Sequence, residues 1–171
     1  MPPDYKIPES VLVVIHTADL QVLLIERAQP RGFWQSVTGS RDTLDEPLEQ
    51  TAAREVFEET GICVGPQTRG AACCCIVPQR NLRNRQLSNV YDIYPIWRQR
   101  YAPGVTRNTE HVFSLLVPEA VSVVLAPREH AHYCWLPYQA AADKCFSPSN
   151  AEAILQLPHF LRVDLQALPP N

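Results

Sequence analysis

The sequence lacks a long apolar segment. Its longest apolar runs span residues 11–15 and 71–77, whereas a helix that crosses a bilayer needs roughly 20 such residues. The first ten residues carry Asp4, Lys6 and Glu9 and have no apolar stretch typical of a secretory signal. We therefore expect a cytoplasmic protein that does not associate with membranes.

A basic excess is also missing, since 15 lysines and arginines stand against 18 aspartates and glutamates. The net charge of −3 gives no reason to expect general binding to nucleic acid. With 46% hydrophobic and 19% charged residues, the composition is typical of a folded protein. The 171 residues contain no internal repeat or low-complexity linker, so we expect one domain over residues 1–171.

The six cysteines do not form a metal-binding clip. Three of them, Cys73, Cys74 and Cys75, are adjacent, which is not CxxC spacing, and no second clip lies elsewhere. Zinc binding or redox chemistry is one interpretation of this triplet. We favour the other, in which the cysteines are small apolar residues in a buried strand.

Hydrophobic patterning predicts strands that are interrupted by two helices. The polar segment 80–89 predicts a loop, and helices are predicted over residues 47–60 and 149–157. The predicted strands cover residues 10–16, 22–26, 33–37, 71–77, 90–98, 111–117, 121–125 and 133–136. This order predicts an α+β protein, with a mixed β-sheet between flanking helices in an α/β/α sandwich.

The helix over residues 47–60 carries three carboxylates on one face. Glu55, Glu58 and Glu59 are spaced i, i+3 and i+4, and therefore project from the same side. Pro47 suits the first helical position, and Gly61 suits a C-terminal stop. Such glutamates are often only the solvated face of a helix. Carboxylates on one stripe also repel one another unless a cation neutralises them, and oxygen ligands suit Mg2+ or Mn2+.

A motif that includes this helix favours the metal-binding interpretation. The segment REVFEETGI, residues 54–62, resembles the second half of the Nudix box without a substitution, and Gly39 and Glu46 match its first half. The family spaces its first glutamate so that it would fall on Asp45. We assign Glu46 instead, because its distance to Arg54 is right and a loop can absorb one extra residue.

The Nudix resemblance implies the Nudix fold and hydrolysis of a phosphoanhydride bond in a small-molecule triphosphate. It implies that Glu55, Glu58 and Glu59 hold divalent metal, Mg2+ or Mn2+, and that the metal neutralises phosphate oxygens and activates water. Arg54 lies four residues before Glu58, where it can orient that carboxylate.

A wider resemblance covers residues from about 5 to about 154. Segments 33–40, 100–111 and 128–136 are similar to the family of bacterial dihydroneopterin triphosphate pyrophosphatases. That family implies release of pyrophosphate and formation of dihydroneopterin monophosphate, in folate biosynthesis. The polar stretch 80–89 and the C-terminal tail are longer here than in that family.

The same resemblance implies further site residues. Glu129 is implied as a metal ligand from outside the box, or as a base toward the attacking water; Glu110 is our second choice for the extra ligand, and Arg107 a supporting residue. The implied catalytic residues are Arg54, Glu55, Glu58, Glu59 and Glu129. The implied substrate-binding residues are Lys6, Arg27 and Thr38 near the phosphates, Tyr91, Asp92, Ile93 and Tyr94 near the pterin, and His130 and Ser147.

Three alternatives remain beside the pterin triphosphate. A nucleoside triphosphate pyrophosphohydrolase, acting on dATP or damaged nucleotides, would share the whole metal site. A non-catalytic Nudix-fold binding module is disfavoured, because such modules usually lose the glutamates that stand here at Glu55, Glu58 and Glu59. A zinc or redox protein would instead depend on residues 73–75.

Overall fold

The computed structural model describes residues 4–66 and 72–168. None of the helices in these two ranges is long and apolar enough to cross a membrane. The strands are β1 (Glu9–His16), β2 (Gln21–Arg27), β3 (Trp34–Gln35), β4 (Val37–Ser40), β5 (Ile62–Val64), β6 (Cys75–Val77), β7 (Leu82–Asp92), β8 (Arg107–Leu116) and β9 (His130–Pro137). The α-helices are α1 (Leu48–Thr60), α2 (Tyr138–Lys144), α3 (Pro148–Leu155) and α4 (Leu157–Gln166), and the 3-10 helices are η1 (Gln79–Asn81) and η2 (Pro95–Arg100).

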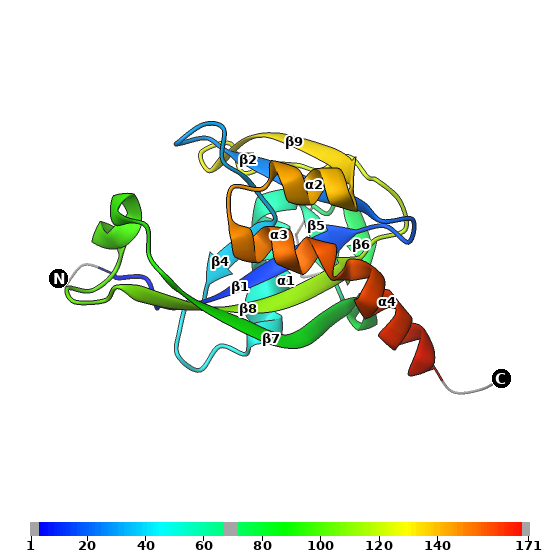
Figure 1. Ribbon diagram of the computed structural model, residues 1–171, viewed down its shortest axis with the longest axis horizontal. Coiled ribbons are helices and arrows are strands. Elements are labelled where there is room, and N and C mark those ends of the chain that lie inside the picture. Colours follow the sequence, from blue (N-terminus) through cyan, green and yellow to red (C-terminus); the bar gives the residue numbers. More distant parts are fainter. Residues whose placement is uncertain (1–3, 67–71, 169–171) are drawn as a thin grey trace.

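A seven-stranded mixed sheet forms the centre of the fold, and β1 lies inside it (Figure 1). β1 runs parallel to β8 along its whole length, while the other pairings in this sheet are antiparallel. The other edge of β1 is shared, since Ser10 to Val13 pair with β4 and His16 pairs with β2. β5 and β6 form a separate parallel pair.

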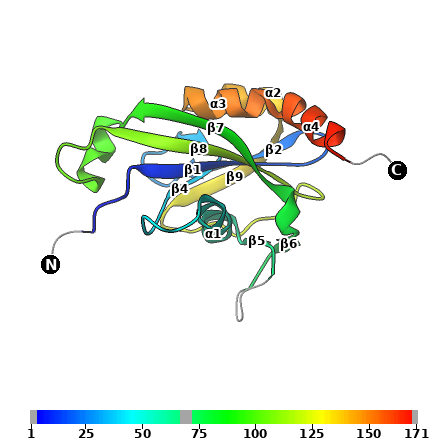
Figure 2. The same cartoon turned by 90° about the horizontal axis from the view of Figure 1, so that it is seen from below.

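Helices cover both faces of this sheet, as Figure 2 shows, with α1 on one side and α2, α3 and α4 on the other. Because side chains alternate along a strand, β1 contributes to two cores. Val11, Val13 and Ile15 pack with α1 residues Ala52 and Val56. Leu12, Val14, Val22 and Leu24 pack on the opposite face with Ala141, Ala153, Ile154, Leu157 and Phe160. The predicted α/β/α sandwich is therefore confirmed.

The side chain of an arginine in β7 links helix α4 to the sheet. Arg85 in β7 donates two hydrogen bonds of 2.8 Å to the carboxylate of Asp164 and one of 2.8 Å to Ser114 Oγ. The Cζ atom of its guanidinium also lies 4.7 Å from the centroid of the Phe160 ring. These contacts hold α4, which begins at Leu157 and contains Pro158, so most of the C-terminal tail without a predicted structure is helical.

Two predictions about residues 80–98 are wrong. The polar segment expected to be a loop is most of β7, and residues 95–98, expected at the end of a strand, belong to η2. β7 is an edge strand whose backbone pairs with β8, with a break in register between Asn84 and Ser88. Backbone pairing at an edge needs no apolar side chains, so hydrophobic patterning could not reveal this strand.

Other boundaries differ for related reasons. Residues 121–125 form no strand, because Val123 packs into the core while the Val124 N–H donates to the Thr60 carbonyl at 2.9 Å. Of the strand predicted over 71–77, residue 71 lies outside the described ranges, and only Cys75–Val77 is a strand. The alanine-rich helix α2 was not predicted, although alanine has the highest helix propensity.

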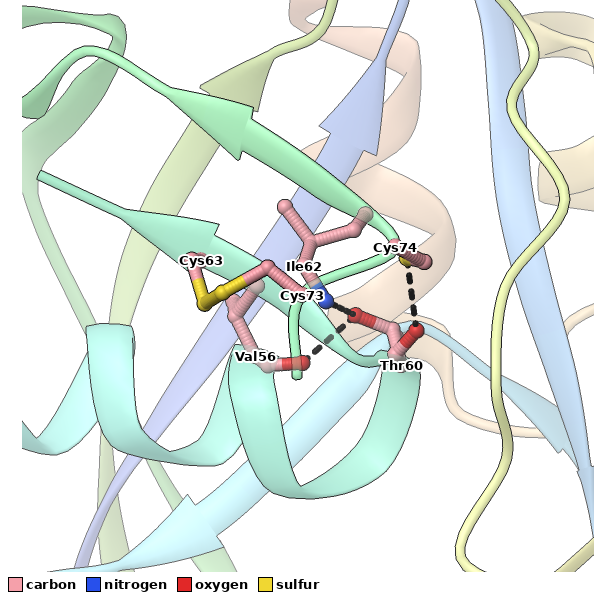
Figure 3. The surroundings of a disulfide bond; sticks show 6 residues. All are labelled: Val56, Thr60, Ile62, Cys63, Cys73 and Cys74. Carbon is pink, nitrogen blue, oxygen red and sulfur yellow. Dashed lines mark hydrogen bonds between the residues drawn. A yellow bond between two sulfur atoms is a disulfide. The ribbon is translucent and has the colours of Figure 1, made fainter. Parts of the chain in front are cut away.

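The prediction that the adjacent cysteines are buried strand residues is wrong for Cys73 and Cys74. Cys63 in β5 forms a disulfide with Cys73, and their Cα atoms are 5.6 Å apart, within the usual range (Figure 3). Cys74 is exposed, and its thiol donates to the Thr60 carbonyl at 3.4 Å. The adjacent cysteines thus brace the turn that follows α1.

Candidate active site

The helix α1 presents its carboxylates on a fixed frame. It begins at Leu48, one residue after Pro47, and ends at Thr60, and the next residue, Gly61, has a φ of 75° in the left-handed region. The Gly61 N–H donates to the Phe57 carbonyl at 2.8 Å, so glycine closes the helix as predicted. Glu59 is buried, whereas Glu58 is exposed at the helix surface.

A glycine in β4 makes room for Glu55. A Cβ atom added to Gly39 would lie 1.8 Å from Glu55 Cδ and 2.0 Å from Glu55 Oε1. No side chain fits between strand and carboxylate, so any larger residue must push Glu55 aside. The pairing of β4 with β1 thereby sets the place of this carboxylate.

Arg54 organises the acidic residues around it. Its Nε donates to Glu46 Oε1 and its Nη1 to Glu55 Oε1, both at 2.9 Å, and Nη1 reaches Glu58 Oε2 at 3.4 Å. Burial alone would lower the pKa of Arg54, but the bonds to Glu46 and Glu55 raise it, so Arg54 stays charged. Glu46 is buried and faces Arg54 while Asp45 is exposed, which supports the choice of Glu46 as the box residue.

Two adjacent residues where β9 begins, Glu129 and His130, bring ligand atoms close to Glu59 of α1. One ligand atom each from Glu59, Glu129 and His130 lie within 4.8 Å of one another. His130 is only 4% exposed, and neither ring nitrogen has a hydrogen-bond partner within residues 4–66 and 72–168. Its Nε2 lies 3.2 Å from Glu59 Oε1. Nε2 therefore faces the Glu59 carboxylate, while Nδ1 is a buried ring nitrogen without a partner in the described part of the chain, which leaves it for a ligand.

The carboxylates here are held close together against their mutual repulsion. Burial and the neighbouring Glu59 raise the pKa of Glu55 to about 8, with Arg54 opposing the shift. Burial raises the pKa of Glu59 as well, with His130 opposing. A divalent cation would relieve this unfavourable charge. The donor set of four carboxylates and one buried imidazole therefore fits a metal ion.

These residues line the first of two adjoining cavities, which we call the acidic cavity. Its volume is about 420 Å³, and its walls include Arg54, Glu55, Glu58, Glu59, Glu129 and His130. The second, the aromatic cavity, has a volume of about 390 Å³. Its walls include Tyr91, Tyr94, Trp97, Asn108, Glu110, Phe146 and Ser149.

Basic side chains stand where the two cavities meet. Lys6, Arg27 and Arg100 line both, together with Gln35, Thr38 and Gly39. Burial lowers the pKa of Lys6 and of Arg27, and in each case Arg100 lowers it further. The Lys6 N–H donates to the Arg100 carbonyl at 2.9 Å, which holds the N-terminal segment at this junction. Three cationic side chains this close together repel one another, so this position suits the binding of an anionic part of a ligand.

The aromatic cavity is walled by packed rings. Phe33 stacks on Phe146 with centroids 4.7 Å apart, and Trp97 meets both in edge-on contacts at 6.1 Å. The guanidinium of Arg27 lies 4.5 Å from the Trp97 ring centroid. A flat apolar wall next to hydrogen-bonding groups suits a heterocycle.

Comparison with known proteins agrees with this geometry. The sequence profile of the NUDIX domain matches residues 6–157. The chain belongs to the Nudix family. It is 42% identical over 153 residues to dihydroneopterin triphosphate diphosphatase of Escherichia coli K12, covering 89% of this chain and 93% of that protein. The Haemophilus influenzae protein of the same name is 36% identical over 151 residues, covering 88% and 87%.

Solved structures confirm the Nudix fold. The E. coli dihydroneopterin triphosphate pyrophosphohydrolase superposes with a TM-score of 0.74 at 40% identity, covering 90% of this chain and 96% of that one. The Ap4A hydrolase of Caenorhabditis elegans, at 16% identity and a TM-score of 0.57, covers 90% and 97% and shares the fold alone. Nudix hydrolases generally use divalent metal ions, and the acidic cavity offers the matching cluster.

The structure divides the predicted site residues of this Nudix protein between the two cavities. Those lining the acidic cavity are Arg54, Glu55, Glu58, Glu59, Glu129 and His130. Those lining the aromatic cavity are Tyr91, Asp92, Ile93, Tyr94 and Ser147, while Lys6, Arg27 and Thr38 line both. His130, predicted to contact substrate, thus lies with the carboxylates, and Glu110, second choice as a metal ligand, lies in the aromatic cavity.

Several residues of the Nudix site were not singled out from the sequence. Arg100 lines both cavities as a third cation beside Lys6 and Arg27, and its position at the start of segment 100–111 did not indicate this role. Trp97 and Phe146 come from η2 and the α2–α3 connection, where nothing in the local sequence marks a ligand wall.

Proposed function

We propose that this Nudix protein hydrolyses dihydroneopterin triphosphate to dihydroneopterin monophosphate and pyrophosphate with the help of Mg2+. The proposal rests on the arrangement of three sites in a row. The acidic cavity comes first, then the basic junction formed by Lys6, Arg27 and Arg100, and then the aromatic cavity. A triphosphate with a flat heterocycle has the same order of groups. The similarity to enzymes named for dihydroneopterin triphosphate supports the choice of heterocycle.

Glu55, Glu58, Glu59 and Glu129 are the residues proposed to hold the metal. Their hard oxygen donors suit Mg2+, and Mn2+ would fit the same site, particularly with His130 beside it. When bound, such an ion supplies charge neutralisation at phosphate oxygens and activation of water. Arg54 keeps Glu55 and Glu58 in place through its bonds to both carboxylates.

The basic junction positions the polyphosphate in this proposal. Lys6, Arg27 and Arg100 supply cationic donors for its oxygens. In-line displacement at phosphorus depends mainly on such positioning and on charge compensation. The alternative role for Glu129, an exposed residue that lines the acidic cavity, is to accept a proton from the attacking water in place of holding the metal.

Product analysis tests the proposal. Purified protein is incubated with dihydroneopterin triphosphate and Mg2+, and pyrophosphate is distinguished from orthophosphate. We expect pyrophosphate and the monophosphate in equal amounts, metal-dependent turnover, and a higher kcat/KM than for deoxynucleoside triphosphates. The exchange Glu49→Gln, on an exposed position of α1 outside both cavities, is the matched control for exchanges of the metal-site glutamates.

Other outcomes point to the alternatives. Turnover of dATP or another deoxynucleotide at least as efficient as that of the pterin would identify a nucleoside triphosphate pyrophosphohydrolase. Absence of pyrophosphate release across a panel of triphosphates would identify a binding module.

A further inference from the structure

Strand β8 presents two buried hydrogen-bonding side chains to the aromatic cavity. Asn108 and Glu110 are two residues apart, so they project from the same face of the strand. Asn108 is 2% exposed and Glu110 is 5% exposed, and both line the cavity. Ordinary packing does not explain a buried carboxylate beside aromatic walls.

Within residues 4–66 and 72–168, the NH2 group of Asn108 is already hydrogen-bonded, whereas acceptor atoms of Asn108 and Glu110 remain available. Asn108 Nδ2 donates to Ser10 Oγ at 2.7 Å and to the Tyr91 hydroxyl at 3.1 Å, whereas Asn108 Oδ1 has no partner. Glu110 Oε1 accepts one bond of 3.2 Å from Ser149 Oγ, and the carboxylate has no ion pair in these ranges. Burial raises the pKa of Glu110 to about 7, while hydrogen bonds from Ser149 and the Tyr91 hydroxyl oppose the shift. The end of the cavity therefore offers acceptors and needs a ligand with donors.

The complementary ligand is a flat ring with adjacent N–H groups. An amino group next to a ring N–H, as on a 2-amino-4-oxopyrimidine, offers two parallel donors that match a carboxylate. Adenine differs, because it offers one amino group next to a bare ring nitrogen. Dihydropterin and guanine both carry the 2-amino-4-oxopyrimidine edge.

We infer that Glu110 is a specificity-determining residue, whose carboxylate accepts hydrogen bonds from the amino and ring N–H groups of a 2-amino-4-oxopyrimidine, with Asn108 Oδ1 beside it. The inference rests on the proposed function, since it assumes that the aromatic cavity receives the heterocycle of a triphosphate substrate. Glu110 acts in selection of the substrate, while the phosphates remain held at the basic junction.

The exchange Glu110→Gln tests this inference. It keeps the shape of the side chain but replaces one acceptor by an NH2 donor, which opposes the ring N–H of pterin and guanine and matches the ring nitrogen of adenine. We expect kcat/KM to fall roughly 10- to 100-fold for dihydroneopterin triphosphate and for dGTP, mainly through KM, and to stay level or rise for dATP. Glu119→Gln, at an exposed position outside both cavities, serves as control.

Each outcome decides one question. An unchanged ratio of pterin to dATP turnover in a folded Glu110→Gln protein overturns the inference, and so does an equal loss for all three substrates. If the wild-type protein does not act on dihydroneopterin triphosphate, the proposed function fails, while the ratio of dGTP to dATP turnover still decides the role of Glu110. Thermal unfolding of the variant checks that it is folded.

Discussion

The acidic and aromatic cavities differ in how the chain builds them. The acidic cavity depends on α1, β4 and the start of β9, and its groups are charged and suited to any polyphosphate. The aromatic cavity combines β7, β8, η2 and the α2–α3 connection, and its groups are rings and neutral or buried acceptors. In our proposal, reactivity and selection of substrate therefore lie in different elements, which meet at Lys6, Arg27 and Arg100.

The exchange Glu59→Gln should have the largest effect, because it removes a buried carboxylate from the acidic cavity. We expect kcat to fall on the order of a thousandfold for every triphosphate, since the metal site loses a central ligand. Without metal, the unfolding temperature should not fall, because burial disfavours the Glu59 charge. Steady-state kinetics and calorimetry with and without Mg2+ measure both effects.

Glu49→Gln is the comparison for this exchange and should behave like wild type. Near-normal turnover by the Glu59→Gln protein would show that the metal lies elsewhere. A loss confined to the pterin substrate would break the proposed division between the cavities.

The exchange Gly39→Ala should have the next largest effect. The added methyl group would occupy the place of the Glu55 carboxylate, so we expect kcat to fall about a hundredfold while the fold is kept. A crystal structure should show Glu55 turned away from β4. The matched exchange Gly104→Ala meets no atom within 4 Å at the new Cβ, although its φ of 86° makes some loss of stability expected there. Full activity of Gly39→Ala would contradict the proposed position of Glu55.

Removal of an aromatic wall should have a smaller and more selective effect. Trp97→Ala takes away a ring that packs on Phe33 and Phe146, and we expect KM for dihydroneopterin triphosphate to rise about tenfold, with a lesser change in kcat. Trp97→Phe keeps a ring there and should retain most of the affinity. A large fall in kcat with unchanged KM would argue that the aromatic cavity does not bind the heterocycle.

A change remote from both cavities should alter stability alone. Arg85 lowers the pKa of Asp164, so this pair stabilises the fold above the ordinary aspartate pKa of 3.8 and the contribution is lost as the pH falls through the lower folded value. Asp164→Asn should lower the free energy of unfolding by about 1 kcal/mol at pH 7, given partial exposure, and by less under acid conditions. Denaturant titrations at pH 7 and pH 3, with Asp143→Asn as control, measure this. Altered KM in Asp164→Asn would show that α4 influences the site.

The acidic cavity was largely predictable from the sequence, because a helix places residues at fixed spacings. Arg54, Glu55, Glu58 and Glu59 lie within six consecutive positions, and the helix stops before Gly61 as expected. The burial of Glu59 and the close approach of Gly39 to Glu55 were not predictable, since both depend on how β4 packs against α1.

The aromatic cavity was less predictable because its residues are far apart in the chain. The rings of Tyr94, Trp97 and Phe146 all line it, and they meet only once the whole chain has folded. Alternation along β8 shows that Asn108 and Glu110 share a face, but not which face is hollow. The part of the cavity wall that β7 forms was not predictable either, because an edge strand is stabilised by backbone hydrogen bonds and can have a polar sequence.

The attachment of Lys6 beside Arg100 has a practical consequence for handling the protein. An affinity tag placed before residue 4 would begin only a few residues from a side chain that lines both cavities. A tag after α4 would follow a helix that lines neither cavity. Kinetic work should therefore use a C-terminal tag, or a cleavable N-terminal one that is removed before assay.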